Sequence, residues 1–391
     1  MLWFSFWFLV ASALLAAAWS LRGERRRAET ASDRLAGEAE AWRPPVSVIV
    51  PIVEPIEGLR DNLESLVAQE YSEFELILVA RGKDDLPPNG LPSRAKVVFS
   101  SEAGLGAQLR AGVKAARRMS QVFAFTDGKG RAAPGWLRSL VAPLQDEEVG
   151  AGGGCVWYTP EPPSFWSLMR SVWYAPLAER AAELAPPWGG ALAIRRQLVE
   201  EAGLDKLWEA GVRDDLGLSK ALAEAEARLE FAPGAMAPRR ARAGAGEFLR
   251  EAAARLRRLR QEQPEWWRRQ VWAHLLQCAA MAAILGAIAA GSRLIEWALV
   301  AQFGLLMLKG LNRATLAKAA LPQSQAWFER HSWIFAIWAP LTTWVWLWTL
   351  ILSTFEPPRA TPSAAVEPEP EEQAPAVEKP GSWPPTPPSL Q

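Results

Sequence analysis

Residues 46–80 read VSVIVPIVEPIEGLRDNLESLVAQEYSEFELILVA. The stretch opens with a β-branched run at 46–51 and closes with another at 75–80, and proline or charged residues bound both runs. Between them, residues 58–70 carry apolar side chains at helical spacing. A strand, a helix and a second strand in this order predict the unit from which parallel sheets are built.

The same alternation continues toward residue 235. Strand-like runs recur at 96–100 (KVVFS) and 121–127 (QVFAFTD), and helical spacing recurs at 106–118 and 134–145. Strands that alternate with helices over this length predict an α/β fold whose sheet is mostly parallel and covered by helices on both faces. Ligands of such sheets bind at the carboxyl ends of the strands, so the residues that follow each strand are candidates for a site.

The composition restricts the class of protein. The chain has 391 residues, half of them apolar, and 43 Lys and Arg balance 43 Asp and Glu. This length exceeds one ordinary domain, and the neutral charge argues against a nucleic-acid-binding protein. The chain has two cysteines, Cys155 and Cys278, and two histidines, His274 and His331. These numbers and spacings exclude a disulfide framework, a Cys-rich zinc module and a histidine-based metal site.

A charge-free stretch at residues 2–21 has about the 20 residues that cross a bilayer as a helix. Four arginines follow it at once: Arg22, Arg25, Arg26 and Arg27. A cleavable signal peptide would carry its positive charge before the apolar run, so we expect residues 1–21 to be a transmembrane anchor and 22–44 a basic linker. The positive-inside rule then places the chain from residue 22 onward in the cytoplasm.

Further apolar segments lie near the C-terminus, and we expect transmembrane helices within residues 271–355, at about 271–290, 294–308 and 333–355. Basic residues flank the first two segments: Arg268 and Arg269 before the first, and Lys309, Arg313 and Lys318 after the second. This pattern predicts a hairpin that leaves and re-enters the cytoplasmic side, after which the third segment exits again. A buried helical hairpin of a soluble protein is the alternative for the first two.

Charge composition sets two further segments apart. Residues 239–270 contain ten Arg and four Glu beside Trp266 and Trp267. This composition fits an amphipathic helix on an anionic cytoplasmic leaflet, and a solvated basic helix is the alternative. Residues 356–391 hold eleven of the 31 prolines and six Glu, so this tail cannot bury a core and is expected to be disordered.

Five motifs follow one another along the chain: VSVIVP at 46–51, ELILVARGKDD at 75–85, FTDGKGRAAPGWL at 125–137, PPWGGALAIRR at 186–196 and GVRDDLGLSKAL at 211–222. In this order they resemble membrane-anchored family 2 glycosyltransferases, especially the ceramide-glucosyltransferase-like bacterial branch that includes hopanoid glycosyltransferases. The resemblance covers about residues 45–270. It extends to the arrangement of one N-terminal and several C-terminal membrane helices.

The resemblance implies a GT-A fold, a Rossmann-like mixed and mostly parallel sheet, over residues 45–238. It also implies a nucleotide-sugar donor, usually a UDP-sugar, and a lipid acceptor presented at the membrane surface. An inverting sugar transfer needs a cradle for the nucleotide, positive charge on the leaving diphosphate, and a base for the proton of the acceptor hydroxyl.

The loop after the second strand commonly supplies an acidic residue to the nucleotide in this family. Here Ala80 and Arg81 stand at the matching positions, and Asp84 and Asp85 come slightly later. Gly82 and Asp85 are therefore the expected donor-binding residues of this loop. The alternative is that these aspartates are solvated loop charges.

The family also has an Asp-x-Asp element that brings a divalent cation, Mg²⁺ or Mn²⁺, against the diphosphate. Asp127 matches the first acidic position and is the expected metal ligand, whereas Lys129 stands where the second carboxylate would be. The Lys129 ammonium could itself neutralise the diphosphate without a metal, so both residues are assigned to donor binding. The alternative is a loop lysine in a site that no longer binds donor.

Asp214 and Asp215 lie just before an apparent helix. In the resembling family the second acidic residue of this pair acts as the general base, which would be Asp215 here. Simple capping of the helix is the alternative. Trp188, in the glycine-containing PPWGG segment, is assigned to the acceptor side.

A final family element, Gln-x-x-Arg-Trp, normally lies on an interfacial helix after the catalytic domain. Its best counterpart starts at Arg255, with Arg258 in the arginine position and Leu259 where tryptophan is expected. Arg255 and Arg258 are therefore assigned to the acceptor and the membrane surface.

These observations lead to one hypothesis and one rival. The hypothesis is a membrane-bound hexosyltransferase, multi-pass in a bacterial inner membrane, with a cytoplasmic catalytic domain that delivers sugar to a membrane lipid. The rival is a catalytically degenerate relative that acts as a scaffold or binds lipid or nucleotide, because several motif positions are substituted.

Overall fold

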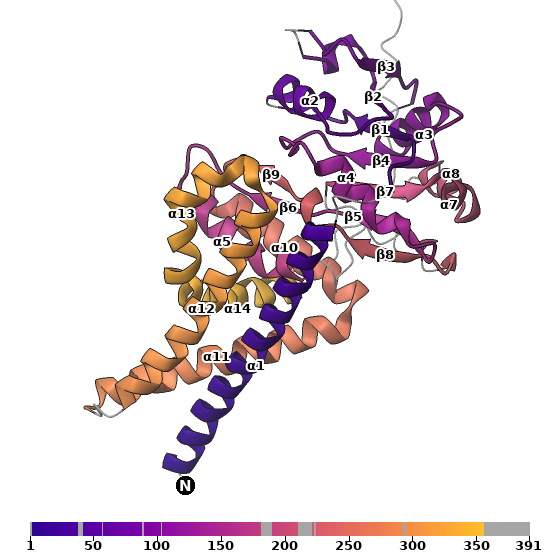
Figure 1. Cartoon of the computed structure of the whole chain (residues 1–391). Coiled ribbons are helices and arrows are strands. Elements are labelled where there is room, and N and C mark those ends of the chain that lie inside the picture. Colours follow the sequence, from indigo (N-terminus) through magenta and orange to yellow (C-terminus); the bar gives the residue numbers. More distant parts are fainter. Residues whose placement is uncertain are drawn as a thin grey trace, which may run out of the picture. The chain divides into compact units, whose positions relative to one another are not determined.

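The computed structural model describes most of the chain (Figure 1). The described residues are 2–37, 42–56, 58–87, 90–102, 104–180, 190–209, 221–222, 224–291 and 295–355. The tail at 356–391 lies outside them, so its disorder stays a prediction.

A seven-stranded mixed sheet forms the centre of the fold, in the order β3-β2-β1-β4-β7-β5-β8. β1 pairs in parallel with β2 and β4, β2 with β3, and β5 with β8, whereas β7 runs antiparallel between β4 and β5. The strands are β1 (Val46–Pro51), β2 (Phe74–Ala80), β3 (Ala95–Phe99), β4 (Val122–Thr126), β5 (Val149–Gly153), β7 (Ala191–Arg195) and β8 (Arg228–Phe231). The predicted α/β class and the mostly parallel sheet are confirmed.

Both faces of the sheet are covered, because successive side chains of a strand point to opposite sides. Val48 and Val50 of β1 lie in one core, with Leu63 of α2 and Trp136 of α4. Ile49 lies in the other core, with side chains of α3, α7 and α8. These helices are α2 (Leu59–Val67), α3 (Leu105–Ala115), α4 (Trp136–Val141), α7 (Arg196–Glu201) and α8 (Leu204–Glu209).

A second, two-stranded parallel sheet pairs β6 (Val156–Tyr158) with β9 (Ala237–Arg239). Helix α5 (Phe165–Glu179) packs against β6. Ser164 caps α5 by accepting a hydrogen bond from the backbone N–H of Ser167. The C-terminal half of the chain forms five further helices among the described residues: α10 (Ala245–Glu262), α11 (Pro264–Ala289), α12 (Glu296–Ala320), α13 (Gln325–Ile337) and α14 (Ala339–Phe355).

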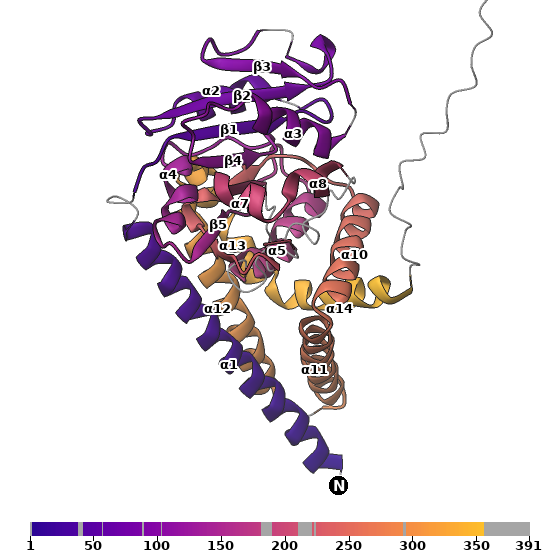
Figure 2. The same ribbon diagram turned by 90° about the vertical axis from the view of Figure 1, so that its right-hand side faces the viewer.

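Among the residues that the structure describes, two helices are long and apolar enough to cross a membrane, α1 (Leu2–Gly37) and α11. They pack against each other and against α12 (Figures 1 and 2). The polar Gln277 of α11 lies at this contact, where its side chain donates a hydrogen bond to the Ala13 carbonyl at 2.7 Å and accepts one from Gln302 at 2.9 Å.

The expected linker at 22–44 is helical as far as residue 37, because α1 continues without a break beyond its apolar run. Near the end of α1, Arg34 forms an ion pair with Glu230 of β8 and donates a hydrogen bond to the Phe231 carbonyl at 2.8 Å. The anchor therefore docks directly on the edge of the large sheet.

The expected third span at 333–355 is not one straight helix. The segment that ends with α13 is bent by 72° from α14, and Pro340 lies in the first turn of α14. Proline favours a helix start because it lacks the backbone N–H of a continuing helix. Figure 2 shows α14 running across the direction of α1 and α11. Hydropathy alone gives no sign of this change of direction.

Helix α10 occupies much of the predicted basic interfacial segment at 239–270. Its apolar residues Phe248, Leu256 and Leu259 pack with side chains of α5 and α14. The apolar face that the sequence predicts to lie on lipid is therefore covered by protein, because periodicity reveals an apolar face but not what covers it.

Candidate active site

The loop after β4 contains the residues that the sequence predicts at the donor site. Asp127 follows the last residue of β4, and its side chain is 22% exposed. Its Oδ1 accepts a hydrogen bond from the backbone N–H of Lys129 at 3.0 Å, and its Oδ2 accepts one from the guanidinium of Arg239. The carboxylate thus holds its own loop and an arginine from a distant part of the chain.

Gly128 determines the shape of this loop. Its φ is +64°, in the left-handed region, and a Cβ added there would lie 2.9 Å from Cγ1 of Val50. The side-chain amide of Asn62 in α2 donates a hydrogen bond to the Gly128 carbonyl at 2.9 Å. Glycine is therefore required at this position, and the loop is held against β1 and α2.

Lys129 forms an ion pair with Glu54, which lies three residues beyond the end of β1. The two residues meet because β1 and β4 are neighbouring parallel strands, whose carboxyl ends share one edge of the sheet. The hydrogen bond from Lys129 and its positive charge hold the pKa of Glu54 below its ordinary value. The pair is therefore charged at neutral pH.

Arg239, the last residue of β9, adds a second positive charge beside Asp127. Burial opposes the charged form of Arg239, but Asp127, Tyr158 and Tyr174 together outweigh burial and raise the pKa of the guanidinium. The guanidinium of Arg239 and the backbone N–H of Lys129 therefore hold the same carboxylate from opposite parts of the domain sequence.

Asp127 and Arg239 line a cavity of about 170 Å³. The other lining residues are Cys155, Val156, Tyr158, Tyr174, Leu177, Ala178, Gly190 and Arg255. Pockets for whole small-molecule ligands commonly measure about 300–1,000 Å³, so this cavity fits part of a large ligand.

One wall of the cavity is aromatic and cationic. The rings of Tyr158 and Tyr174 lie 4.7 Å apart between centroids, and the guanidinium of Arg255 lies 5.5 Å from the Tyr174 centroid. The structure therefore brings the predicted Arg255 beside Asp127 in one cavity. Burial raises the pKa of the Cys155 thiol to about 12, so this residue stays protonated and is no nucleophile at neutral pH.

Other predicted residues lie elsewhere. Asp85 accepts a hydrogen bond from the backbone N–H of Arg81 at 3.0 Å and pairs with its guanidinium, which lowers the pKa of Asp85. Gly82 has extended backbone, and a Cβ there would meet nothing within 4 Å. Arg258 is exposed on α10. None of the three lines the described part of the cavity.

The predicted catalytic pair, Asp214 and Asp215, and the acceptor-side Trp188 lie outside the described residues. Their roles stay predictions. Sequence reasoning in turn missed Glu54 and Arg239. The available signal for Glu54 was an acidic residue three positions beyond the first strand, the same offset that Lys129 has from the fourth.

The described residues do not fit a conventional two-acid metal site at Asp127. They contain no group of three or more His, Cys, Asp or Glu that could hold a metal ion. The carboxylate of Asp127 is already bonded to Arg239, and Lys129 stands two residues further on. Arg239 therefore already supplies positive charge to the Asp127 carboxylate.

Comparison with known proteins assigns this domain. Residues 47–203 match glycosyl transferase family 2, and residues 5–88 match glycosyl transferase family 21. Residues 47–203 are therefore similar to a family 2 glycosyltransferase domain. This similarity supports a transferase enzyme, and the matched region contains Glu54, Asp127 and Lys129.

Individual relatives of the family 2 domain are distant. EpsH of Bacillus subtilis (strain 168), a protein named as a glycosyltransferase, is 30% identical over 110 residues, which are 27% of this chain and 31% of EpsH. The chain thus matches about a third of the length of this curated relative.

Solved structures also resemble the chain. The mannosyltransferase PcManGT from Pyrobaculum calidifontis, in complex with GDP-Man and Mn²⁺, is 18% identical with a TM-score of 0.41, over 88% of this chain and 97% of that one. Glucosyl-3-phosphoglycerate synthase from Mycobacterium tuberculosis, with Mn²⁺, UDP-glucose and phosphoglyceric acid, is 18% identical with a TM-score of 0.33, over 57% and 77%.

Proposed function

We propose that the protein is a membrane-bound inverting glycosyltransferase that moves a hexose from a UDP-sugar to a lipid acceptor in the membrane. The observation that carries this proposal is the cluster in which Arg239 pairs with Asp127 and the nearby Lys129 pairs with Glu54, at the strand edge of a family 2-like domain. The cluster borders a cavity that fits part of a nucleotide-sugar.

The charges of the cluster suit the leaving group. When the bond between the sugar and the diphosphate breaks, negative charge develops on the diphosphate, and positioned cations stabilise it. When the donor binds, the Lys129 ammonium leaves Glu54 and pairs with the diphosphate. Asp127 orients Arg239 toward the oxygens of the same diphosphate. The partly buried setting of Arg239 strengthens its interaction, whereas Lys129 and Glu54 are more exposed to solvent.

The acceptor hydroxyl must lose a proton as it attacks the sugar carbon from the face opposite the diphosphate. We assign the role of general base, which accepts this proton, to Asp215, the neighbour of Asp214 in sequence. This assignment rests on the family resemblance of the GVRDDLGLSKAL segment. Arg255 borders the cavity and is assigned to the acceptor side.

A divalent cation, Mg²⁺ or Mn²⁺, is common in this class, and Asp127 together with diphosphate oxygens would be its ligands. It would supply positive charge to the leaving group. Because Asp127 is bonded to Arg239 and Lys129 replaces the second acid, we propose that the side-chain cations supply that charge instead.

We further propose that the protein is multi-pass in the inner membrane of a bacterium, with its catalytic domain in the cytoplasm, where nucleotide-sugars are made. The apolar α1 and α11 support a membrane location. The arginines after residue 21 and before residue 271 support the orientation.

A transfer assay tests the proposal. Purified protein in lipid nanodiscs is incubated with a panel of radiolabelled UDP-hexoses and a bacterial lipid extract, and label in the lipid phase is measured. We expect transfer from one donor and its loss in Asp127→Asn, which cannot hold Arg239 by charge. UDP binding without transfer from any donor would favour the rival, a degenerate relative that binds nucleotide.

A further inference from the structure

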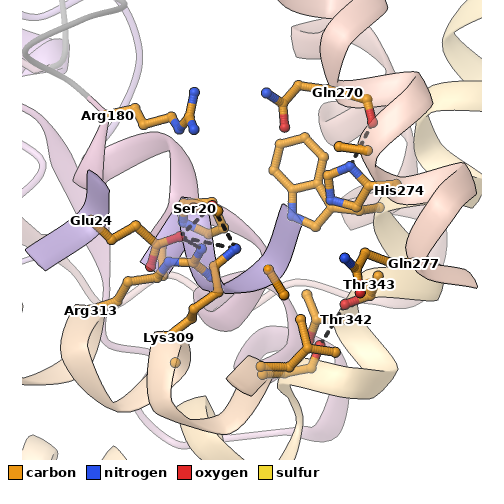
Figure 3. A pocket seen from close by; sticks show the side chains of 18 of the residues that line it. Ser20, Glu24, Arg180, Gln270, His274, Gln277, Lys309, Arg313, Thr342 and Thr343 are labelled. Atoms are coloured by element: carbon orange, nitrogen blue, oxygen red, sulfur yellow. Dashed lines mark hydrogen bonds and ion pairs between the residues drawn. The ribbon is translucent and has the colours of Figure 1, made fainter. Parts of the chain in front are cut away.

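A second cavity, of about 400 Å³, lies among helices α1, α5, α11, α12 and α14 (Figure 3). It is larger than the cavity at Asp127, and the proposed transfer chemistry does not use it. Five charged residues line it: Glu24, Arg180, Arg269, Lys309 and Arg313. Most of the remaining wall is apolar, and it includes Leu306, Phe335 and Trp346.

The charges of this cavity do not balance within its described lining, where four cationic side chains face one carboxylate. Glu24 is only 1% exposed, and its Oε1 lies 3.1 Å from Nζ of Lys309 and 2.6 Å from Nη2 of Arg313. Figure 3 shows Arg180 and Gln270 pointing toward the same space from opposite sides. The positive charges of this described lining favour an anionic ligand.

The cavity lies where three helices change from apolar to basic sequence. Ser20 and Glu24 flank the end of the apolar run of α1, Arg269 directly precedes the apolar run of α11, and Lys309 ends that of α12. Such boundaries mark the level of the lipid headgroups when helices cross a bilayer. Because two of these boundaries belong to the candidate membrane spans α1 and α11, we expect the charged side of the cavity to lie at headgroup depth.

We propose that this cavity binds the phosphate-bearing headgroup of a membrane lipid. Arginine guanidinium groups match phosphate oxygens in geometry and charge, and they do so through paired hydrogen bonds. Pro176 within α5 has no N–H for the Val172 carbonyl, and both residues line the cavity, so the wall also offers a backbone acceptor to a headgroup hydroxyl. The apolar wall suits the chains of a lipid better than a free anion.

Helix α5 separates this cavity from the one at Asp127. The second cavity is lined from α5 by Val172, Ala175 and Pro176. The cavity at Asp127 is lined from the same helix by Tyr174 and Leu177. The two cavities therefore lie on different faces of one helix, which is about 10 Å across. A headgroup held in the second cavity is about one helix width from the cavity at Asp127. The idea that this headgroup belongs to the acceptor rests on the proposed function, but lipid binding itself does not require sugar transfer.

Direct binding tests the inference. Full-length protein in neutral detergent is titrated calorimetrically with dioctanoyl phosphatidic acid, with dioctanoylglycerol, which lacks the phosphate, and with inorganic phosphate. We expect phosphatidic acid to bind at least about tenfold more tightly than either comparator, since each lacks one half of the recognised ligand. Equal affinity for dioctanoylglycerol would overturn the phosphate assignment, and equal affinity for inorganic phosphate would overturn the lipid assignment.

Matched variants locate the site. Arg269→Gln should raise the Kd for phosphatidic acid about tenfold, whereas Arg268→Gln, which removes the same charge from an adjacent residue outside the cavity lining, should change it less than about twofold. Glu24→Gln should act in the opposite direction and tighten binding, because Lys309 and Arg313 lose a competing carboxylate. Thermal unfolding of each variant checks folding.

Equal losses in Arg268→Gln and Arg269→Gln would mean that general surface charge binds the lipid, and would overturn the inference. The transfer assay separates this failure from that of the proposed function. Binding without transfer leaves the lipid site standing, whereas transfer with no phosphatidic acid binding removes it.

Discussion

Lys129 and Glu54 form an ion pair across the carboxyl ends of two neighbouring parallel strands, although 75 residues separate them in sequence. The pair places a lysine where the family resemblance leads one to expect a second carboxylate. It also gives that lysine a negative partner that a diphosphate can replace. We therefore expect this contact to influence whether donor binding needs a metal.

Lys129→Gln should weaken UDP binding about tenfold, because it removes one charge-assisted contact to the diphosphate. EDTA should leave UDP binding by the unmodified protein unchanged within about twofold. Isothermal titration calorimetry measures both effects. Loss of binding in EDTA would show that a metal supplies the charge, and Lys129→Asp would then be expected to strengthen the metal dependence.

Titration of Glu54 should not change UDP binding between pH 6 and 8. Its pKa is lowered from 4.5 by the hydrogen bond and charge of Lys129, so the carboxylate is ionised throughout this range. A depressed folded-state pKa contributes stability above the unfolded value, and this contribution is lost as pH falls through the folded pKa. Melting temperatures of Glu54→Gln and the unmodified protein should therefore differ at pH 7 and converge below about pH 4. A difference that grows on acidification would contradict the ion pair.

Asp215→Asn should lower the rate of transfer by about a hundredfold or more while UDP affinity changes little, because asparagine keeps the size but not the basicity. If Asp215 only caps a helix, the same change should leave the rate of transfer and the stability nearly unchanged, because asparagine caps a helix about as well as aspartate. Asp214→Asn is the matched control, with a smaller expected loss. Single-turnover kinetics and calorimetry separate the two outcomes.

Reporter fusions after Arg27 and after Arg269 should both be cytoplasmic, as the flanking arginines predict. We expect a fusion after Phe355 on the same side. α14 runs across α1 and α11, and its exposed stripe of Leu341, Trp344 and Trp348 suits a helix that lies in the interface rather than one that spans. A periplasmic reporter after Phe355 would instead restore the straight third span predicted from hydropathy.

Gly128→Ala should lower the free energy of unfolding by about 1–3 kcal/mol, because it combines a left-handed backbone with a Cβ only 2.9 Å from Val50. Gly82→Ala is the control, with extended backbone and open space around its Cβ position, and it should change stability by less than about 1 kcal/mol. Denaturant unfolding compares the two. Equal losses would argue against the tight contact.

The sheet was predictable because β-branched runs and helical spacing are local signals, and Asp127 was predictable because it ends such a run. Arg239 was not, because it meets Asp127 across 112 residues and lies on a strand of three residues with no distinctive pattern. For α10, the sequence predicted the apolar face but not its packing partners. Contact of this face with α5 and α14 depends on tertiary structure. The bend before α14 was missed because both arms are apolar.

The continuous α1 restricts where the protein can work. Its sixteen residues from 22 to 37 extend the helix by about 24 Å beyond the apolar run, and Arg34 attaches that extension to the sheet. A catalytic domain attached in this way cannot move freely into the aqueous phase to search for acceptor. If the acceptor is a lipid, encounters take place by lateral diffusion in two dimensions. The rate should then follow the mole fraction of acceptor in the bilayer rather than its bulk concentration, and added inert lipid should slow the reaction by surface dilution.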